Sequence, residues 1–268
     1  MSLTDEQKKL KAISDAEIST IDRNIALFTD GLEKLGIELQ RRVVNLIAGE
    51  WTVERASAAQ SLVDLQKAIQ AQLNSVGYVE LVRKFMGSYD DAQKFSLQAL
   101  EAMGITPVRL ARIDELALKR LREIDYSYLE GLGPAAVRAV SSGAIQNTLL
   151  GVRRAEIIEA VKTTLDAKLK NHACTYADTA LVSYDRTSSS KLYIAAGIER
   201  FLYRGPLDVK TREFCRQHVG KTYTIDEIRK MKNGLEPPMG QVLIFGGGWN
   251  CRHVWAAAPP EKKSARAA

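Results

Sequence analysis

Cysteine and histidine are scarce in this 268-residue chain, which contains three of each. So few thiols cannot build the framework of bridges that holds many small secreted domains together, and a reducing compartment would disfavour even one bridge. The fold must therefore depend on a hydrophobic core. The composition allows such a core, because 46% of the residues are hydrophobic and 26% are charged.

Long apolar runs are also missing. No stretch approaches the roughly 18 consecutive apolar residues of a membrane span. The first residues, MSLTDEQKKLKAISDAEIS, contain no apolar core segment and no small-residue cleavage site of a secretory signal. We therefore expect a protein that is made in the cytoplasm and has no membrane partner.

Positive charge is concentrated near the end of the chain. The 38 basic and 32 acidic residues give a net charge of +6, and residues 204–268 hold 12 of the basic and 6 of the acidic ones. The first 203 residues are thus balanced. A basic segment of this kind favours an acidic partner such as nucleic acid, and a solvated surface without a partner is the alternative.

Hydrophobic periodicity predicts helices over most of the first two hundred residues. One stripe alternates spacings of three and four, as in a coiled coil or a helix of a bundle. Its members are Ile18, Ile21, Ile25, Phe28, Leu32, Leu35, Leu39, Val43 and Leu46. The stripe fits a seam with another protein or a contact within the chain, and both alternatives stay open.

A second stripe predicts the buried face of a later helix, and a chain break follows it. The stripe consists of Leu110, Ile113, Ala117, Leu121, Ile124 and Tyr128. The sequence GLGP at 131–134 predicts a break and a hinge. Helical pattern returns from Arg153 to about Lys170 and, more weakly, from Ala177 to Ala196.

From Glu199 the pattern changes to that of a small sheet. ERFLYRG alternates like a strand, QVLIFGGGW and VWAAAPP are apolar, and TIDEIRKM predicts a helix capped by Thr224 and Glu227. The fold class is therefore α+β, with a mostly α-helical N-terminal region and a small C-terminal α+β domain. We expect a helical docking arm at 1–133, a helical segment at 134–198, the α+β domain at 199–260 and a flexible basic tail at 261–268.

Two cysteines and two histidines cluster in this last part. Cys215 and His218 have two residues between them, and Cys251 and His253 have one. Side chains at these spacings can face one point, and two thiolates with two imidazoles would enclose a tetrahedral zinc ion. Such a closed site would stabilise the domain and leave no position for catalysis. A Cys215–Cys251 disulfide and a metal-free set of buried thiols are the alternatives.

Motifs of catalysis are not found. GKT at 220–222 lacks the preceding glycine of a phosphate-binding loop, because Cys215 stands there. No nucleophile has an evident base and orienting group. We therefore predict no catalytic residues and a protein that is not an enzyme.

Four segments in a fixed order resemble a known family. They are DVKTREFC at 208–215, GKTYTIDEI at 220–228, NG at 233–234 and GGWNCRH at 247–253. Together they resemble the Mu F-like head-morphogenesis domain of tailed bacteriophages, found in minor head (minor capsid) proteins. The resemblance covers about the last 115 residues and places YDRTSSSK on the helix before the sheet. The motif positions are Asp208, Thr211, Cys215, Gly220, Asn250, Cys251 and Arg252.

The resemblance implies a virion component with a role in head assembly. Such a protein associates with the portal and with capsid subunits in the host cytoplasm, stays in the head near the portal vertex, and affects DNA packaging or ejection. Many members have cysteines where this chain has His218 and His253. A structural zinc site tolerates that exchange, although neither version need bind a metal.

The same resemblance places the basic segment beside packaged DNA. Sequence-independent contacts with phosphate groups are then expected, and the candidates are Arg212, Arg216, Lys221, Arg229, Lys230 and Arg252. Two other functions stay open. One is a metal-dependent nuclease or nucleotidyl-modifying effector carried in the virion, and the other is a cytoplasmic DNA-binding module.

Overall fold

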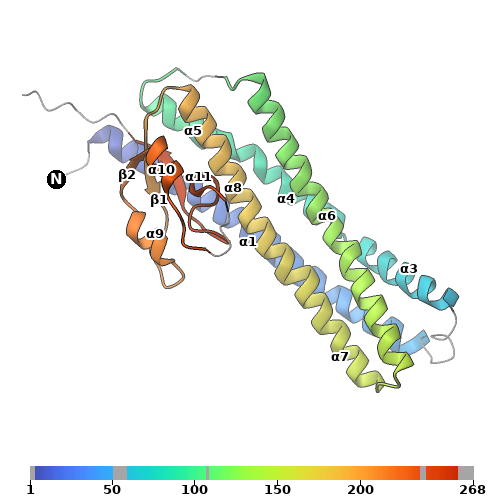
Figure 1. Cartoon of the computed structure of the whole chain (residues 1–268). Helices are drawn as coiled ribbons and strands as arrows, with labels where there is room; N and C mark the ends of the chain where they lie inside the picture. The colour runs from blue at the N-terminus through green and yellow to red at the C-terminus, as the bar shows by residue number, and fades with distance from the viewer. Residues whose placement is uncertain (1–3, 51–58, 107–108, 236–239, 259–268) are drawn as a thin grey trace, which may run out of the picture. The chain divides into compact units, whose positions relative to one another are not determined.

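The computed structural model describes residues 4–50, 59–106, 109–235 and 240–258, and helices dominate it (Figure 1). The helices before the sheet are α1 (Asp5–Glu50), α3 (Ala59–Ser75), α4 (Tyr78–Gly87), η1 (Ser88–Asp91), α5 (Ala92–Ala102), α6 (Arg112–Leu149), α7 (Arg154–Leu165), η2 (Asp166–Asn171) and α8 (His172–Ala195). The elements after them are β1 (Arg200–Arg204), α9 (Glu213–His218), β2 (Thr222–Thr224), α10 (Ile225–Lys230), α11 (Val242–Phe245) and β3 (Val254–Ala257). The predicted α+β class is confirmed. The predicted tail at 261–268 lies outside the described residues.

Hydropathy gives no membrane-spanning segment among the described helices, since none combines the necessary length with sufficient apolar character.

The chain forms two compact units that interleave along the sequence. The first consists of the described residues of Met1–Arg23, Gly87–Arg122 and Asp178–Ala268, and the second of those of Asn24–Met86 and Glu123–Ala177. Neither unit is one continuous segment. The α+β domain expected at 199–260 is therefore part of a larger unit, to which α1 and α5 also contribute.

The second unit is helical, and the first apolar stripe lies in it from Ile25 onward. Phe28, Leu32 and Leu39 of α1 are buried, and the ring of Phe28 lies 4.5 Å from that of Phe85 in α4. The Tyr78 hydroxyl donates to the Leu129 carbonyl at 2.5 Å. For these positions the alternative of a contact within the chain is confirmed.

Helix α6 differs from the prediction in two ways. It continues through GLGP with Pro134 inside it, so the predicted break is wrong. Its predicted buried face is wrong as well, because Ile113 is 76% and Ile124 54% exposed, whereas Leu118 and Leu129 are buried. The hydrophobic period correctly predicted a helix, but α6 is buried on the face that contains Leu118 and Leu129. Apolar residues lie on both faces, so the period alone does not show which face is buried.

The sheet in the first unit has the order β2-β1-β3, and both pairs are antiparallel. In β1, Phe201 and Tyr203 are buried and alternate with partly exposed residues, as predicted. Tyr203 pairs with Trp255 of β3. These side chains share a core with Leu10 of α1 and Leu100 of α5.

The connections of the sheet show one confirmed and one wrong prediction. Thr224 caps α10, because its hydroxyl accepts from the Glu227 N–H at 3.3 Å and its own N–H donates to the Glu227 carboxylate at 2.7 Å. The apolar run QVLIFGGGW is not a strand. It forms the short helix α11 and a glycine turn, because three consecutive glycines favour a turn over a ladder.

Candidate metal centre

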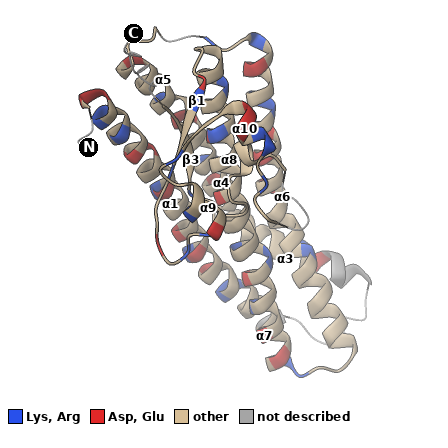
Figure 2. Ribbon diagram, turned by 60° about the vertical axis from the view of Figure 1, so that its left-hand side comes forward, with Lys and Arg blue, Asp and Glu red and all other residues tan. Residues whose placement is uncertain are grey.

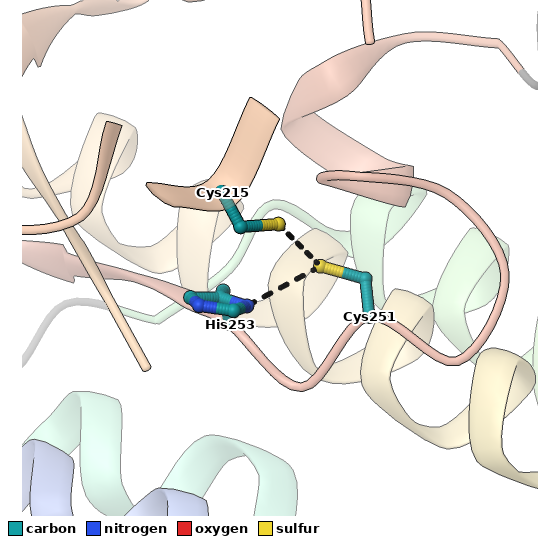
Figure 3. Close-up of side chains that lie close together, drawn as sticks. All are labelled: Cys215, Cys251 and His253. Carbon is teal, nitrogen blue, oxygen red and sulfur yellow. Dashed lines mark hydrogen bonds between the residues drawn. The ribbon is translucent and has the colours of Figure 1, made fainter. Parts of the chain in front are cut away.

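Three of the four predicted ligands converge in the first unit (Figure 3). Cys215 comes from α9, and Cys251 and His253 come from the segment that leads into β3. The two Sγ atoms are 3.8 Å apart, and the Cys251 Sγ lies 3.7 Å from the His253 Nδ1. All three ligand atoms lie within 4.8 Å of one another. The three side chains are 2%, 4% and 3% exposed, so the group can hold a metal ion in a buried site.

The spacing fits tetrahedral coordination of zinc. Bonds of about 2.3 Å to sulfur and about 2.0 Å to nitrogen give tetrahedral edges of about 3.8 Å between two sulfurs and about 3.5 Å between sulfur and nitrogen. The separations of 3.8 Å and 3.7 Å lie within about 0.2 Å of these edges, and the remaining pair, Cys215 and His253, lies within 4.8 Å.

His218 does not join the group. Its Nδ1 atom hydrogen-bonds the Tyr223 hydroxyl at 2.7 Å, and its ring lies 4.4 Å from that of Phe214. Burial lowers the pKa of His218, and the charge of Lys221 lowers it further. On α9 Cys215 faces the core while His218 lies half-buried against aromatic rings, so the two do not face one point as the spacing suggested.

Tyr203 lies against the two sulfurs. Its hydroxyl is 3.5 Å from the Cys215 Sγ and 3.4 Å from the Cys251 Sγ. Its ring stacks on that of His253 at 5.2 Å and 12°. Burial raises the pKa of Tyr203 well above its ordinary value. The sequence did not indicate this residue, because an aromatic side chain in a strand is typical of any core.

Two glycines let the backbone approach these side chains closely. A Cβ at Gly247 would lie 2.5 Å from the Cys215 Sγ, and one at Gly205 would lie 2.3 Å from the His253 ring. Separations this short are not found for real Cβ atoms. The glycines of GGGW and YRG therefore have a packing reason at the metal centre.

Arg186 of α8 fixes the loop that carries two of the ligands. It is 2% exposed and donates to the carbonyls of Cys251 at 2.6 Å, His253 at 2.7 Å and Ile244 at 2.9 Å. The prediction missed it, because its partners are backbone atoms about sixty residues away. Its position in YDRTSSSK was the one available signal.

The two thiols differ in acidity. The hydrogen bond between them lowers the pKa of Cys251 and raises that of Cys215, to which burial adds. The Gly247 N–H also donates to the Cys251 sulfur at 3.2 Å, and the charge of Arg186 favours the thiolate there. Cys251 is thus the sulfur prepared to be an anionic ligand.

Asp208 joins the two halves of the family-like motif. Its carboxylate pairs with Arg252, its N–H donates to the Thr211 hydroxyl at 2.8 Å, and its carbonyl accepts from Arg216 at 2.6 Å. The hydrogen bond from Arg252 lowers the pKa of Asp208 to about 2. The other motif positions, Gly220 and Asn250, have positive φ values of 82° and 54°. The motif residues therefore have conformational and bonding reasons for their identities.

The predicted phosphate-binding cations are only partly available. Arg252 and Arg216 are held at Asp208, and Arg229 pairs with Asp226 at 3.2 Å. The remaining three, Arg212, Lys221 and Lys230, are exposed. Acidic and basic residues lie side by side on α10 (Figure 2). The surface is therefore less basic than the residue count suggested.

Comparison of the chain with known protein families, with curated proteins and with solved structures finds no match.

Proposed function

We propose that this protein is a structural and assembly component of a tailed-bacteriophage head, a minor head protein of the Mu F-like kind. The observation that carries the proposal is the convergence of the motif. Its two halves, 208–215 and 247–253, meet through the pair Asp208–Arg252 and the contact between Cys215 and Cys251. Motif residues that contact one another in the folded chain have a structural reason for their identities, as expected of the motif of a structural protein.

We further propose that the Cys215, Cys251 and His253 group binds one structural zinc ion. The edges of the group match tetrahedral coordination, and thiolate and imidazole are ligands that zinc prefers. Burial of all three side chains supports a stabilising role over a catalytic one, because a catalytic ion needs a position open to substrate. This argues against the nuclease alternative.

The partners in this proposal are the portal protein, capsid subunits and packaged DNA. DNA would be contacted without regard to sequence through exposed cations such as Arg212, Lys221 and Lys230. The site of action would be the head interior near the portal vertex, after assembly in the host cytoplasm.

Assembly is tested by coexpression with the portal and major capsid proteins of the same phage. The proposal expects the chain to copurify with the portal and to be incorporated into heads. A protein that enters neither, while it still binds DNA, would support the cytoplasmic DNA-binding alternative instead.

The metal is tested by native mass measurement and thermal unfolding. We expect one zinc per chain, and a lower Tm after chelation, because metal binding contributes folding free energy. Cys215→Ser should lose the metal, whereas Cys174→Ser, which changes the cysteine outside the group, should keep it. Wild-type protein without metal and with a chelator-insensitive Tm would refute the site.

A further inference from the structure

Three ligands leave one corner of a tetrahedral site to be filled. In the described part of the chain, no fourth cysteine, histidine or carboxylate joins Cys215, Cys251 and His253. A structural zinc site is almost always four-coordinate and closed by the protein. Among the described residues, the fourth contact would therefore come from a side chain outside the usual ligand types.

The geometry points to Tyr203, and we infer that its hydroxyl oxygen is the fourth ligand of the bound metal. This inference rests on the proposed zinc site. The Tyr203 oxygen lies 3.5 Å from one sulfur and 3.4 Å from the other, and the sulfurs are 3.8 Å apart. Oxygen at about 2.0 Å and sulfur at about 2.3 Å from a tetrahedral ion are separated by about 3.5 Å. The Tyr203 oxygen thus lies at the separation expected for a tetrahedral ligand from both the Cys215 and the Cys251 sulfur.

The position of Tyr203 is fixed from several sides. The residue is fully buried in the central strand β1, where Trp255 pairs with it across the sheet. Its ring is stacked on the ring of His253, and the ring of Phe214 lies nearly perpendicular to it, with 6.1 Å between the ring centroids. A side chain so constrained holds its oxygen in place before the metal arrives, which reduces the entropy cost of coordination.

Coordination has a definite proton balance. As the metal–oxygen bond forms, the Tyr203 O–H bond breaks, and its proton passes to the buffer. No electron is transferred. Each metal ion therefore releases one proton more from the wild-type protein than from Tyr203→Phe, which keeps the ring and lacks the oxygen.

The alternative is that Tyr203 only donates a hydrogen bond to a thiolate. Both arrangements have similar oxygen–sulfur distances, so the distinction has to be measured. A hydrogen-bonded phenol stays protonated when zinc binds. Removal of the Tyr203 hydroxyl would then lower the affinity for zinc by roughly 10- to 100-fold, the usual cost of losing a hydrogen-bond partner of a metal ligand.

The experiment adds zinc to metal-free protein and records the ultraviolet difference spectrum, the affinity and the protons released in buffers of different ionisation enthalpy. The variants are Tyr203→Phe and, as a matched control, Tyr223→Phe, whose hydroxyl binds His218 outside the group. We expect the difference band of an ionised tyrosine in wild type and in Tyr223→Phe. In Tyr203→Phe we expect no band, one proton fewer and an affinity reduced by more than about 100-fold.

Each outcome is decisive. Zinc binding by the wild type without a tyrosinate band, or with equal proton release by Tyr203→Phe, would overturn the inference and leave the three-ligand site standing. No zinc binding by any of the three proteins would overturn the metal site itself. The spectrum of the wild type alone decides the matter if Tyr203→Phe does not fold.

Discussion

At the scale of single residues, the candidate metal centre requires that position 247 have no side chain. Any side chain there would begin 2.5 Å from the buried Cys215 sulfur, so that the backbone or the sulfur would have to shift within the core. Gly247→Ala should therefore lower the free energy of unfolding by about 1–3 kcal/mol, the cost of overpacking a dense core. Chemical unfolding measures this, and metal analysis should show zinc lost as well.

A matched substitution separates this clash from a general effect of glycine replacement. Gly36 lies within α1, and a Cβ there would meet nothing within 4 Å. Gly36→Ala should raise stability by about 0.5–1 kcal/mol, since glycine is unfavourable inside a helix. Equal behaviour of the two variants would count against the packing argument at Gly247.

Asp185 gives the first unit a dependence on pH. It is fully buried, and neither carboxylate oxygen has a hydrogen-bond partner among the described residues. Burial raises the pKa of Asp185 to about 7, against a smaller lowering by Arg186. Burial also raises the pKa of its neighbour Glu17, to which the charge of Asp185 adds.

The sign of the effect follows from proton linkage. The folded state binds the Asp185 proton more tightly than the unfolded chain, whose carboxyl has a pKa of about 3.9. The stabilisation is complete below pH of about 4 and is lost as the pH rises to about 7, with a slope of at most about 1.4 kcal/mol per pH unit for one proton. The slope for Asp185→Asn should be shallower by up to this amount, and the part that remains comes from other buried carboxyls such as Glu17, whose pKa burial also raises. A wild-type stability that rises over the same range would contradict the assignment.

At the scale of elements, local rules predicted what local interactions determine. The Thr224–Glu227 box and the alternation of β1 involve neighbours in sequence, and both were predicted. The face of α6 and the helix α11 were not, because packing partners from distant segments decide which side of a helix is buried and whether an apolar run extends. The same limit applies at the site.

Residue chemistry identified three of the four metal-centre residues now inferred. Cysteine and histidine are rare enough in the chain for Cys215, Cys251 and His253 to stand out. Tyr203 is one of nine tyrosines, and only its distances to the sulfurs distinguish it. Residue type does not distinguish Arg186 from the other arginines, because only the structure shows that it donates to the Cys251 carbonyl.

Helix α6 contains Pro134, and replacing this proline should increase the stability of the helix. A proline inside a helix removes one backbone hydrogen bond and strains the preceding turn, at about 3 kcal/mol. Pro134→Ala should therefore stabilise the second unit by about 1–3 kcal/mol. This net value allows for the larger conformational entropy of the unfolded chain without proline, which offsets part of the gain. Thermal unfolding measures the gain. An unchanged or lower Tm would indicate that a bend at Pro134 is needed for packing.

At the scale of the whole molecule, DNA binding should be weak and sensitive to salt. Three exposed cations at the proposed contact, Arg212, Lys221 and Lys230, can each neutralise one phosphate. Replacing all three with Ala should make the slope of log affinity against log salt shallower by up to about 3. Titration of a random-sequence duplex over a range of salt concentrations measures the slope.

The matched control removes the same number of charges elsewhere. Lys34, Lys67 and Lys168 are exposed residues of the second unit. Their replacement with Ala leaves the slope unchanged if the contact is local to the first unit. Equal losses in the two triple variants would mean that only the net charge matters.

The interleaving of the units has a consequence for synthesis of the protein. Leu10 emerges early from the ribosome, but Tyr203 and Trp255, with which it shares a core, are translated some two hundred residues later. Throughout that interval Leu10 in the first turns of α1 lacks these packing partners and is exposed to solvent, where chaperones can bind it. Translation speed and chaperone supply should thus limit the yield of the first unit, while the helices between its segments can pack beforehand.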